Sequence, residues 1–100
     1  MDITPNIQET TLTLTLNGTL DSTTAETLSE ALDHFLTADI TALRLDLTGV
    51  DYVSSAGLRM MVRAWHLLPS HQVTLVAPNP TVKEVLKLSG MNKYFQMEEA

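Results

Sequence analysis

The sequence contains no cysteine, which excludes a disulfide framework, a thiol nucleophile and a thiolate metal site. It is also poor in basic residues, with 6 Lys and Arg against 12 Asp and Glu and a net charge of -6. Phosphate backbones are bound by patches of Lys and Arg. We therefore expect no direct nucleic-acid partner.

Long hydrophobic runs are missing as well. The apolar stretches are only a few residues long, whereas a helix that spans a bilayer needs about 20 apolar residues. The first residues, MDITPNIQET, have no basic region followed by an apolar one, so they do not resemble a secretory signal. We therefore expect a cytoplasmic protein without direct membrane contact.

The remaining composition is that of a soluble globular chain, since 44% of the 100 residues are hydrophobic and 18% are charged. A chain of this length buries one core, so we expect a single domain over residues 1–100. Hydrophobic periodicity predicts strands over 3–8, 11–16, 43–47, 73–77 and 94–97, and helices over 23–38, 56–68 and 80–89.

Capping residues mark two of these helices. Thr23 and Glu26 have the spacing of a capping box, while Asn79 and Pro80 have the types expected at an N-cap and a first helical position. Gly90 is expected to close the last helix in the left-handed conformation. Strands that alternate with helices favour right-handed crossovers and parallel pairing. We predict an α/β fold: a mostly parallel mixed sheet of four to five strands, an N-terminal antiparallel edge hairpin and three to four helices.

Two polar loops are candidate sites, because interactions in open α/β sheets gather where strands end and helices begin. They span residues 18–22 and 50–57. In the second loop, Ser54 and Ser55 precede a helix whose free amides and dipole favour an added phosphate. A serine here is most often a simple helix cap, and the alternative of a nucleophile in a strand-serine-helix elbow is disfavoured because Val53 stands where that elbow needs glycine.

No other pattern indicates catalysis or a cofactor. The three histidines, at 34, 66 and 71, lack the spacing of metal ligands, and glycine-rich nucleotide loops are missing. Asp21 and Asp51 fit turn or helix-dipole roles. We expect a non-enzymatic protein without metal or cofactor. Met60 lies off the buried helical stripe and is expected at the surface.

Three motifs, in this order and spacing, resemble the STAS domain family, which includes anti-sigma factor antagonists and the cytoplasmic tails of sulfate transporters. The motifs are Leu16-Asn17-Gly18-Thr19-Leu20-Asp21 with Thr24-Ala25-Glu26, the stretch LDLTGVDYVSSAGL from Leu45 to Leu58, and Leu88-Ser89-Gly90 with Phe95. The resemblance covers nearly the whole chain and is of the antagonist type. In antagonists a regulatory serine lies in Asp-Ser-Ser/Thr-Gly-Leu, and it corresponds to Ser55 here.

The resemblance implies that Ser55 is phosphorylated, with Ser54 as the alternative acceptor. It further implies that the unphosphorylated protein binds an anti-sigma factor serine kinase, that phosphorylation ends this binding, and that a serine phosphatase restores it. The implied partner-binding surface comprises Asp21, Ser22, Asp51, Ser54, Ser55, Ala56, Gly57, Arg59, Met60 and Arg63.

This sequence departs from the antagonist motif at two positions. Ser54 replaces a common aspartate, and Ala56 replaces the second hydroxyl residue. The alternative function is therefore a constitutive STAS scaffold, such as a subunit of a membrane lipid-transport ATPase complex, in which the serine is only a cap. The oligomeric state expected is a monomer or a weak dimer.

Overall fold

In the computed structural model, which describes residues 1–99, five strands form one sheet whose spatial order follows the chain. The strands are β1 (Asp2–Gln8), β2 (Thr11–Leu20), β3 (Ala42–Val53), β4 (Val73–Val76) and β5 (Gln96–Glu98). The helices are α1 (Ala25–Phe35), α2 (Ser55–Leu67), α3 (Pro80–Ser89) and a short 3₁₀ helix, η1 (Met91–Tyr94). β1 and β2 form an antiparallel edge hairpin and the other pairs are parallel, so the predicted α/β fold is confirmed.

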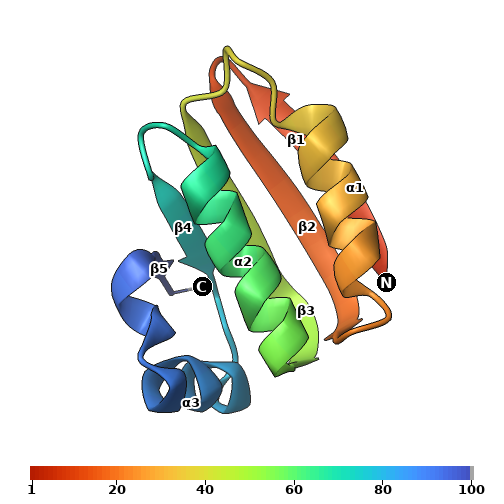
Figure 1. Ribbon diagram of the computed structural model, residues 1–100, viewed down its shortest axis with the longest axis vertical. Helices are drawn as coiled ribbons and strands as arrows, with labels where there is room; N and C mark the ends of the chain where they lie inside the picture. The colour runs from red at the N-terminus through yellow and green to blue at the C-terminus, as the bar shows by residue number, and fades with distance from the viewer. Residues whose placement is uncertain (100) are drawn as a thin grey trace.

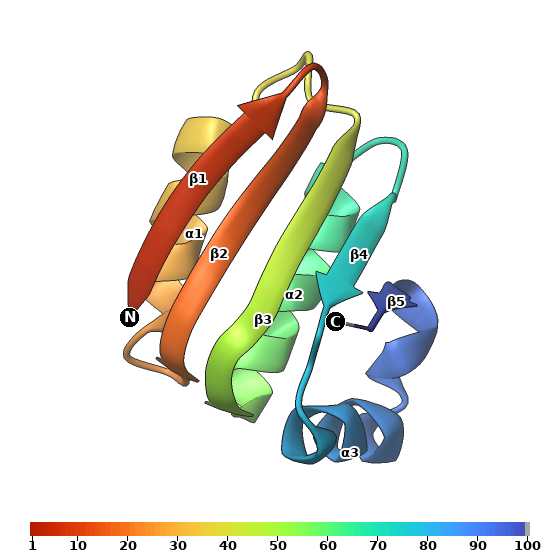
Figure 2. The same cartoon turned by 180° about the vertical axis from the view of Figure 1, so that it is seen from behind.

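The sheet has one covered face and one open face. α1 and α2 lie side by side on the same face, and α3 packs beyond the end of β4 (Figure 1). Among residues 1–99, no helix lies on the reverse face (Figure 2). Period-two alternation explains this arrangement: the leucines of β2 and β3 are fully buried beneath the helices, whereas the intervening polar residues are half-buried on the open face. Burial of each leucine side chain stabilises the folded state by about 1.5–3 kcal/mol.

β2 and β3 both continue past Gly18 and Gly49, beyond the strand ends that we predicted at residues 16 and 47. Register shifts between Thr15 and Asn17 and between Gly18 and Thr19 mark bulges in the pair. Gly18 has a φ of 114°, and a Cβ on Gly49 would lie 1.8 Å from Oδ1 of Asn17. The glycines therefore accommodate bulges inside longer strands, and the prediction that the strands end before them was wrong.

Helix caps were predicted with mixed success. The Asn79 side-chain oxygen accepts a hydrogen bond from the Val82 amide at 2.8 Å, and Gly90 closes α3 with a φ of 74°, as predicted. The Thr23 capping box was wrong, because α1 begins at Ala25 and has no side-chain cap. α1 also ends earlier than predicted, and the last strand starts at residue 96 because residues 91–94 form η1.

Candidate functional site

The two candidate loops meet at the carboxyl edge of the sheet. Leu20 and Val53, the last residues of β2 and β3, are register partners, and α1 and α2 both begin at this edge (Figure 1). The Thr19 hydroxyl donates a hydrogen bond to the Asp51 carboxylate at 2.7 Å, and the Ser54 amide donates to the Leu20 carbonyl at 2.8 Å. Residues more than thirty positions apart thus form one surface.

Asp21 organises the turn that leads into α1. Its carboxylate accepts hydrogen bonds from the amides of Thr23 at 2.9 Å and Thr24 at 3.0 Å, and from the Thr24 hydroxyl at 3.2 Å. These bonds, that from the Thr24 amide above all, hold the pKa of Asp21 below its usual value of 3.8. They also bear on the failed capping box, because the Asp21 carboxylate takes the Thr23 amide that Glu26 was expected to bind. Ser22 is exposed on this turn.

The adjacent serines at the start of α2 differ in their environment. Ser54 is half-buried, and its hydroxyl oxygen accepts a hydrogen bond from the Gly57 amide at 3.3 Å, so it is the N-cap of α2. Ser55 is the first residue of the helix and is exposed. Within residues 1–99 its hydroxyl has no hydrogen-bond partner. The capping role therefore belongs to Ser54, and the Ser55 hydroxyl is accessible.

Gly57 is buried where α2 crosses β2. A Cβ at this position would lie 2.7 Å from the Leu20 carbonyl oxygen and 2.8 Å from Leu20 Cγ. Only glycine allows this approach without a shift of the backbone. Gly57 thus fixes how closely α2 packs on the sheet and lies beneath the surface, while Ala56 is half-buried beside it.

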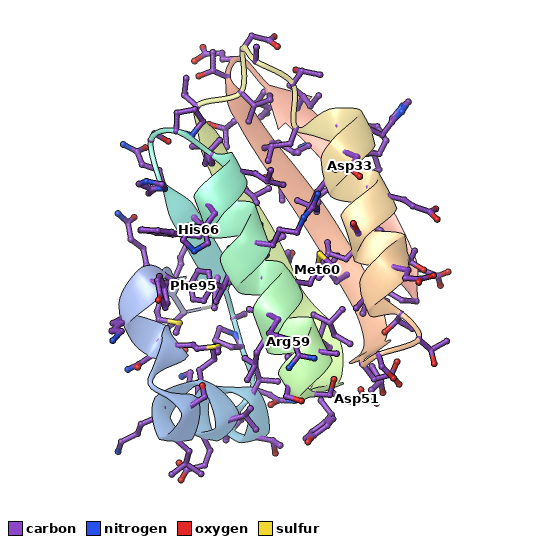
Figure 3. The ribbon with its side chains drawn as sticks, viewed as in Figure 1. Asp33, Asp51, Arg59, Met60, His66 and Phe95 are labelled. Carbon is purple, nitrogen blue, oxygen red and sulfur yellow. The ribbon has the colours of Figure 1, made fainter. Side chains whose placement is uncertain are left out.

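The outer part of α2 contributes one exposed cation and one that is already paired. Arg59 is exposed above Asp51 (Figure 3). Arg63 is half-buried, and its guanidinium donates to the Asp33 carboxylate at 3.2 Å and to a hydroxyl of α1 at 3.3 Å. Met60 lies between α1 and α2 and packs against the core (Figure 3). It is half-buried, which corrects the expectation that it lies on the surface.

Three residues at this edge were not predicted from the sequence to belong to the site. Thr19 holds the Asp51 carboxylate, Asn79 donates to the carbonyls of Val50 at 3.1 Å and Asp51 at 3.3 Å, and Tyr52 is 46% exposed. The first two act on residues about thirty positions away, for which a single sequence gives no signal. Tyr52 could have been found, because an aromatic residue in a polar loop is typical of a contact surface.

The site has no geometry for nucleophilic catalysis or metal binding in the part of the chain that the structure describes. Over residues 1–99, neither serine hydroxyl bonds to a histidine, and no group of three or more His, Cys, Asp or Glu could hold a metal ion. The His71 ring instead stacks on the Trp65 ring at the far end of α2, with the ring centroids 3.8 Å apart. No helix in those residues has the length and apolar character needed to cross a membrane.

Comparison with known proteins gives a consistent result. The model of the STAS domain matches residues 2–100, whereas no curated protein sequence matches the chain. Among solved structures, an anti-sigma factor antagonist from Mycobacterium paratuberculosis has a TM-score of 0.87 at 22% identity, covering 97% of this chain and 84% of that chain.

Two structures of SpoIIAA are also similar. The unphosphorylated form, described as an anti-sigma factor antagonist, has a TM-score of 0.81 at 19% identity over 99% of this chain and 88% of that chain. The phosphorylated form, from Bacillus, has a TM-score of 0.68 at 19% identity over 99% and 91%. At these identities, the similarity to solved structures establishes the fold.

Proposed function

Because the chain belongs to the STAS domain family, we propose that it is an anti-sigma factor antagonist whose binding to an anti-sigma factor serine kinase is switched by phosphorylation of Ser55. The observation that carries this proposal is the division of roles between the two serines. Ser54 is occupied as the helix cap, while Ser55 is exposed with an unbonded hydroxyl among the residues described. A kinase could therefore modify Ser55 without removing the cap of α2.

The chemistry of the edge suits such a switch. A phosphate on Ser55 adds a charge of about -1.5 to -2 at the positive end of α2, so the domain tolerates the modification without refolding. The same group changes the charge and shape of a surface that already carries Asp21 and Asp51. A phosphate at this point would repel acidic groups of a partner and would prevent close packing at the contact, and both effects weaken binding.

The proposed contact surface combines the loops at the strand ends with the exposed part of α2. Ser22, Asp51, Ser55 and Arg59 are accessible there, and Tyr52 adds a large aromatic side chain. Tyrosine and arginine are frequent among the residues that dominate binding energies. Met60 and Arg63 support the surface from the α1–α2 interface. The protein acts in this proposal as a non-enzymatic binding module in the cytoplasm, and a serine phosphatase reverses the modification.

The first test uses the protein as bait in lysate of its native cells, with the wild type, Ser55→Glu, Ser55→Ala and Ser54→Ala compared by mass spectrometry. We expect the wild type and Ser55→Ala to retain a small serine kinase and Ser55→Glu to lose at least tenfold of it, since about 1.4 kcal/mol of repulsion suffices. Incubation with ATP should then add phosphate to wild type and Ser54→Ala, but not to Ser55→Ala.

Circular dichroism of each bait controls for folding. Equal kinase retention by wild type and Ser55→Glu would contradict the switch, and phosphate found on Ser54 would move the acceptor by one residue.

A second candidate function is a constitutive scaffold subunit of a membrane transport complex, of the lipid-transport ATPase type. Ser54 favours it, because a cap serine stands where antagonists commonly have an aspartate. This function predicts that all four baits retain the same transporter subunits and that protein isolated from cells carries no phosphate. The pull-down therefore separates the two functions directly.

A further inference from the structure

β3 extends well beyond its neighbour β4. β4 ends at Val76, which pairs with Asp46, whereas β3 continues to Val53. Figure 2 shows the end of β3 reaching past the arrowhead of β4 to the level of α3. The segment from Leu47 to Val53 therefore has β2 as its only neighbouring strand within residues 1–99. It leads directly into Ser54 and Ser55.

Asn79 occupies the side of β3 that β4 leaves unpaired. Its side-chain nitrogen donates to the carbonyls of Val50 at 3.1 Å and Asp51 at 3.3 Å. Its side-chain oxygen simultaneously accepts from the Val82 amide at 2.8 Å and caps α3. A single half-buried side chain thus links the end of β3 to the start of α3, at a part of β3 that β4 does not reach.

Thr19 completes the restraint from the other side. Its hydroxyl holds the Asp51 carboxylate at 2.7 Å, while Asn79 holds the Asp51 carbonyl. The end of β3 is therefore fixed between β2 and α3, with Tyr52 presented 46% exposed beside it. A segment ordered before binding loses less conformational entropy when a partner docks.

We propose that Asn79 is a positioning residue for the partner-binding surface: it holds the overhanging end of β3, and with it Asp51 and Tyr52, in the arrangement that the partner binds. The proposal extends that surface toward α3, which the sequence did not associate with it. It rests on the proposed function only in taking Asp51 and Tyr52 as partner contacts. The alternative is that Asn79 merely caps α3.

Two variants separate these roles. Asn79→Ser keeps an oxygen that can cap α3 but removes both donors to β3, whereas Asn79→Ala removes the cap as well. Amide hydrogen exchange measured by NMR reports local order without any partner. In Asn79→Ser we expect the exchange rates of the amides at 51–54 to rise about three- to tenfold, because the two hydrogen bonds from Asn79 to β3 are lost. The rates in α1 and at Leu45 should not change. In Asn79→Ala the amides of α3 should also exchange faster.

Unchanged exchange at 51–54 in Asn79→Ser would overturn the proposal, and so would a uniform rise along the whole chain, because it would indicate a purely structural role.

The second readout is affinity for the kinase retained by the wild-type bait. We expect Asn79→Ser to bind it about three- to tenfold more weakly, while Ser55→Glu still weakens binding at least tenfold in both backgrounds. Faster local exchange with unchanged affinity would also overturn the positioning role, although the phosphorylation switch would stand. If no kinase is retained at all, the proposed function fails, and the exchange data alone decide whether Asn79 holds β3.

Discussion

α1 and α2 start at the same edge of the sheet, each directly after a strand, yet their first turns are built differently. Before α1, the Asp21 carboxylate accepts two amides and a hydroxyl, and the Thr24 hydroxyl also bonds to the Thr19 carbonyl at 2.6 Å. Before α2, the residues described provide one side-chain hydrogen bond to the first turn. It runs from the Gly57 amide to the Ser54 hydroxyl oxygen and, at 3.3 Å, is longer than those before α1. The first turn of α1 is internally satisfied, while that of α2 leaves a hydroxyl accessible.

This difference shows where a modification can be accommodated. A phosphate at Thr24 would break several hydrogen bonds of a half-buried turn, whereas a phosphate at Ser55 would break none that the structure shows among residues 1–99. The two helix starts have equally favourable dipoles, so the dipole alone does not distinguish them. Side-chain accessibility does. The two helix starts should therefore contribute differently to the stability of the domain.

The largest effect is expected at Gly57, the third residue of α2. Gly57→Val places two methyl groups where a Cβ alone would lie 2.7 Å from the Leu20 carbonyl oxygen, and should reduce the free energy of unfolding by about 3 kcal/mol or more. The matched control is Thr27→Val at the exposed third position of α1, which should change it by less than about 0.5 kcal/mol. Urea denaturation measures both. Similar values for the two variants would show that α2 does not depend on close packing here.

A smaller effect is expected from Thr24→Val, which preserves shape but removes the hydroxyl. The Asp21 amide and the Thr19 carbonyl then lose partners in a half-buried turn, so the free energy of unfolding should fall by about 2 kcal/mol. Thr24→Ser retains the hydroxyl and should cost less than half as much. Chemical denaturation of the two variants in parallel tests this, and equal losses would assign the effect to the methyl group rather than to the hydrogen bonds.

The smallest effects are expected at the start of α2. Ser54→Ala removes the N-cap and should cost about 1 kcal/mol of unfolding free energy, while Ser55→Ala should change it by less than about 0.5 kcal/mol. Denaturation midpoints of the two variants, recorded under identical conditions, give the comparison. A loss at Ser55 as large as that at Ser54 would mean that its hydroxyl has a structural role.

The elements that depend on local pattern were predictable from the sequence. The alternation of Leu12 to Leu16 and of Leu43 to Leu47 identified the two central strands, because the period of two follows directly from strand geometry. Asn79 and Gly90 identified the ends of α3 for equally local reasons: a side-chain acceptor at the N-cap and tolerance of positive φ at the C-cap. The order of these pieces was sufficient to indicate the family.

The features that depend on residues distant in sequence were not predictable. Gly18 and Gly49 have the sequence signature of turns, and only the pairing of β2 with β3 shows that they occupy bulges. The bonds from Thr19 and Asn79 to β3 likewise need the fold to bring them together. For the candidate site, the serines were found and their separate roles were not, since both have the composition of a cap.

The strand order of the sheet has a consequence for how the domain folds. Every strand lies beside its neighbour in the sequence, so no strand waits for a distant part of the chain before it can pair. The parallel pairs of β2, β3 and β4 are each closed by one intervening helix, and the cost of closing such loops grows only slowly with length. The hairpin and the first crossover can therefore pair without α3, whose Asn79 then fixes the end of β3 beside Ser55.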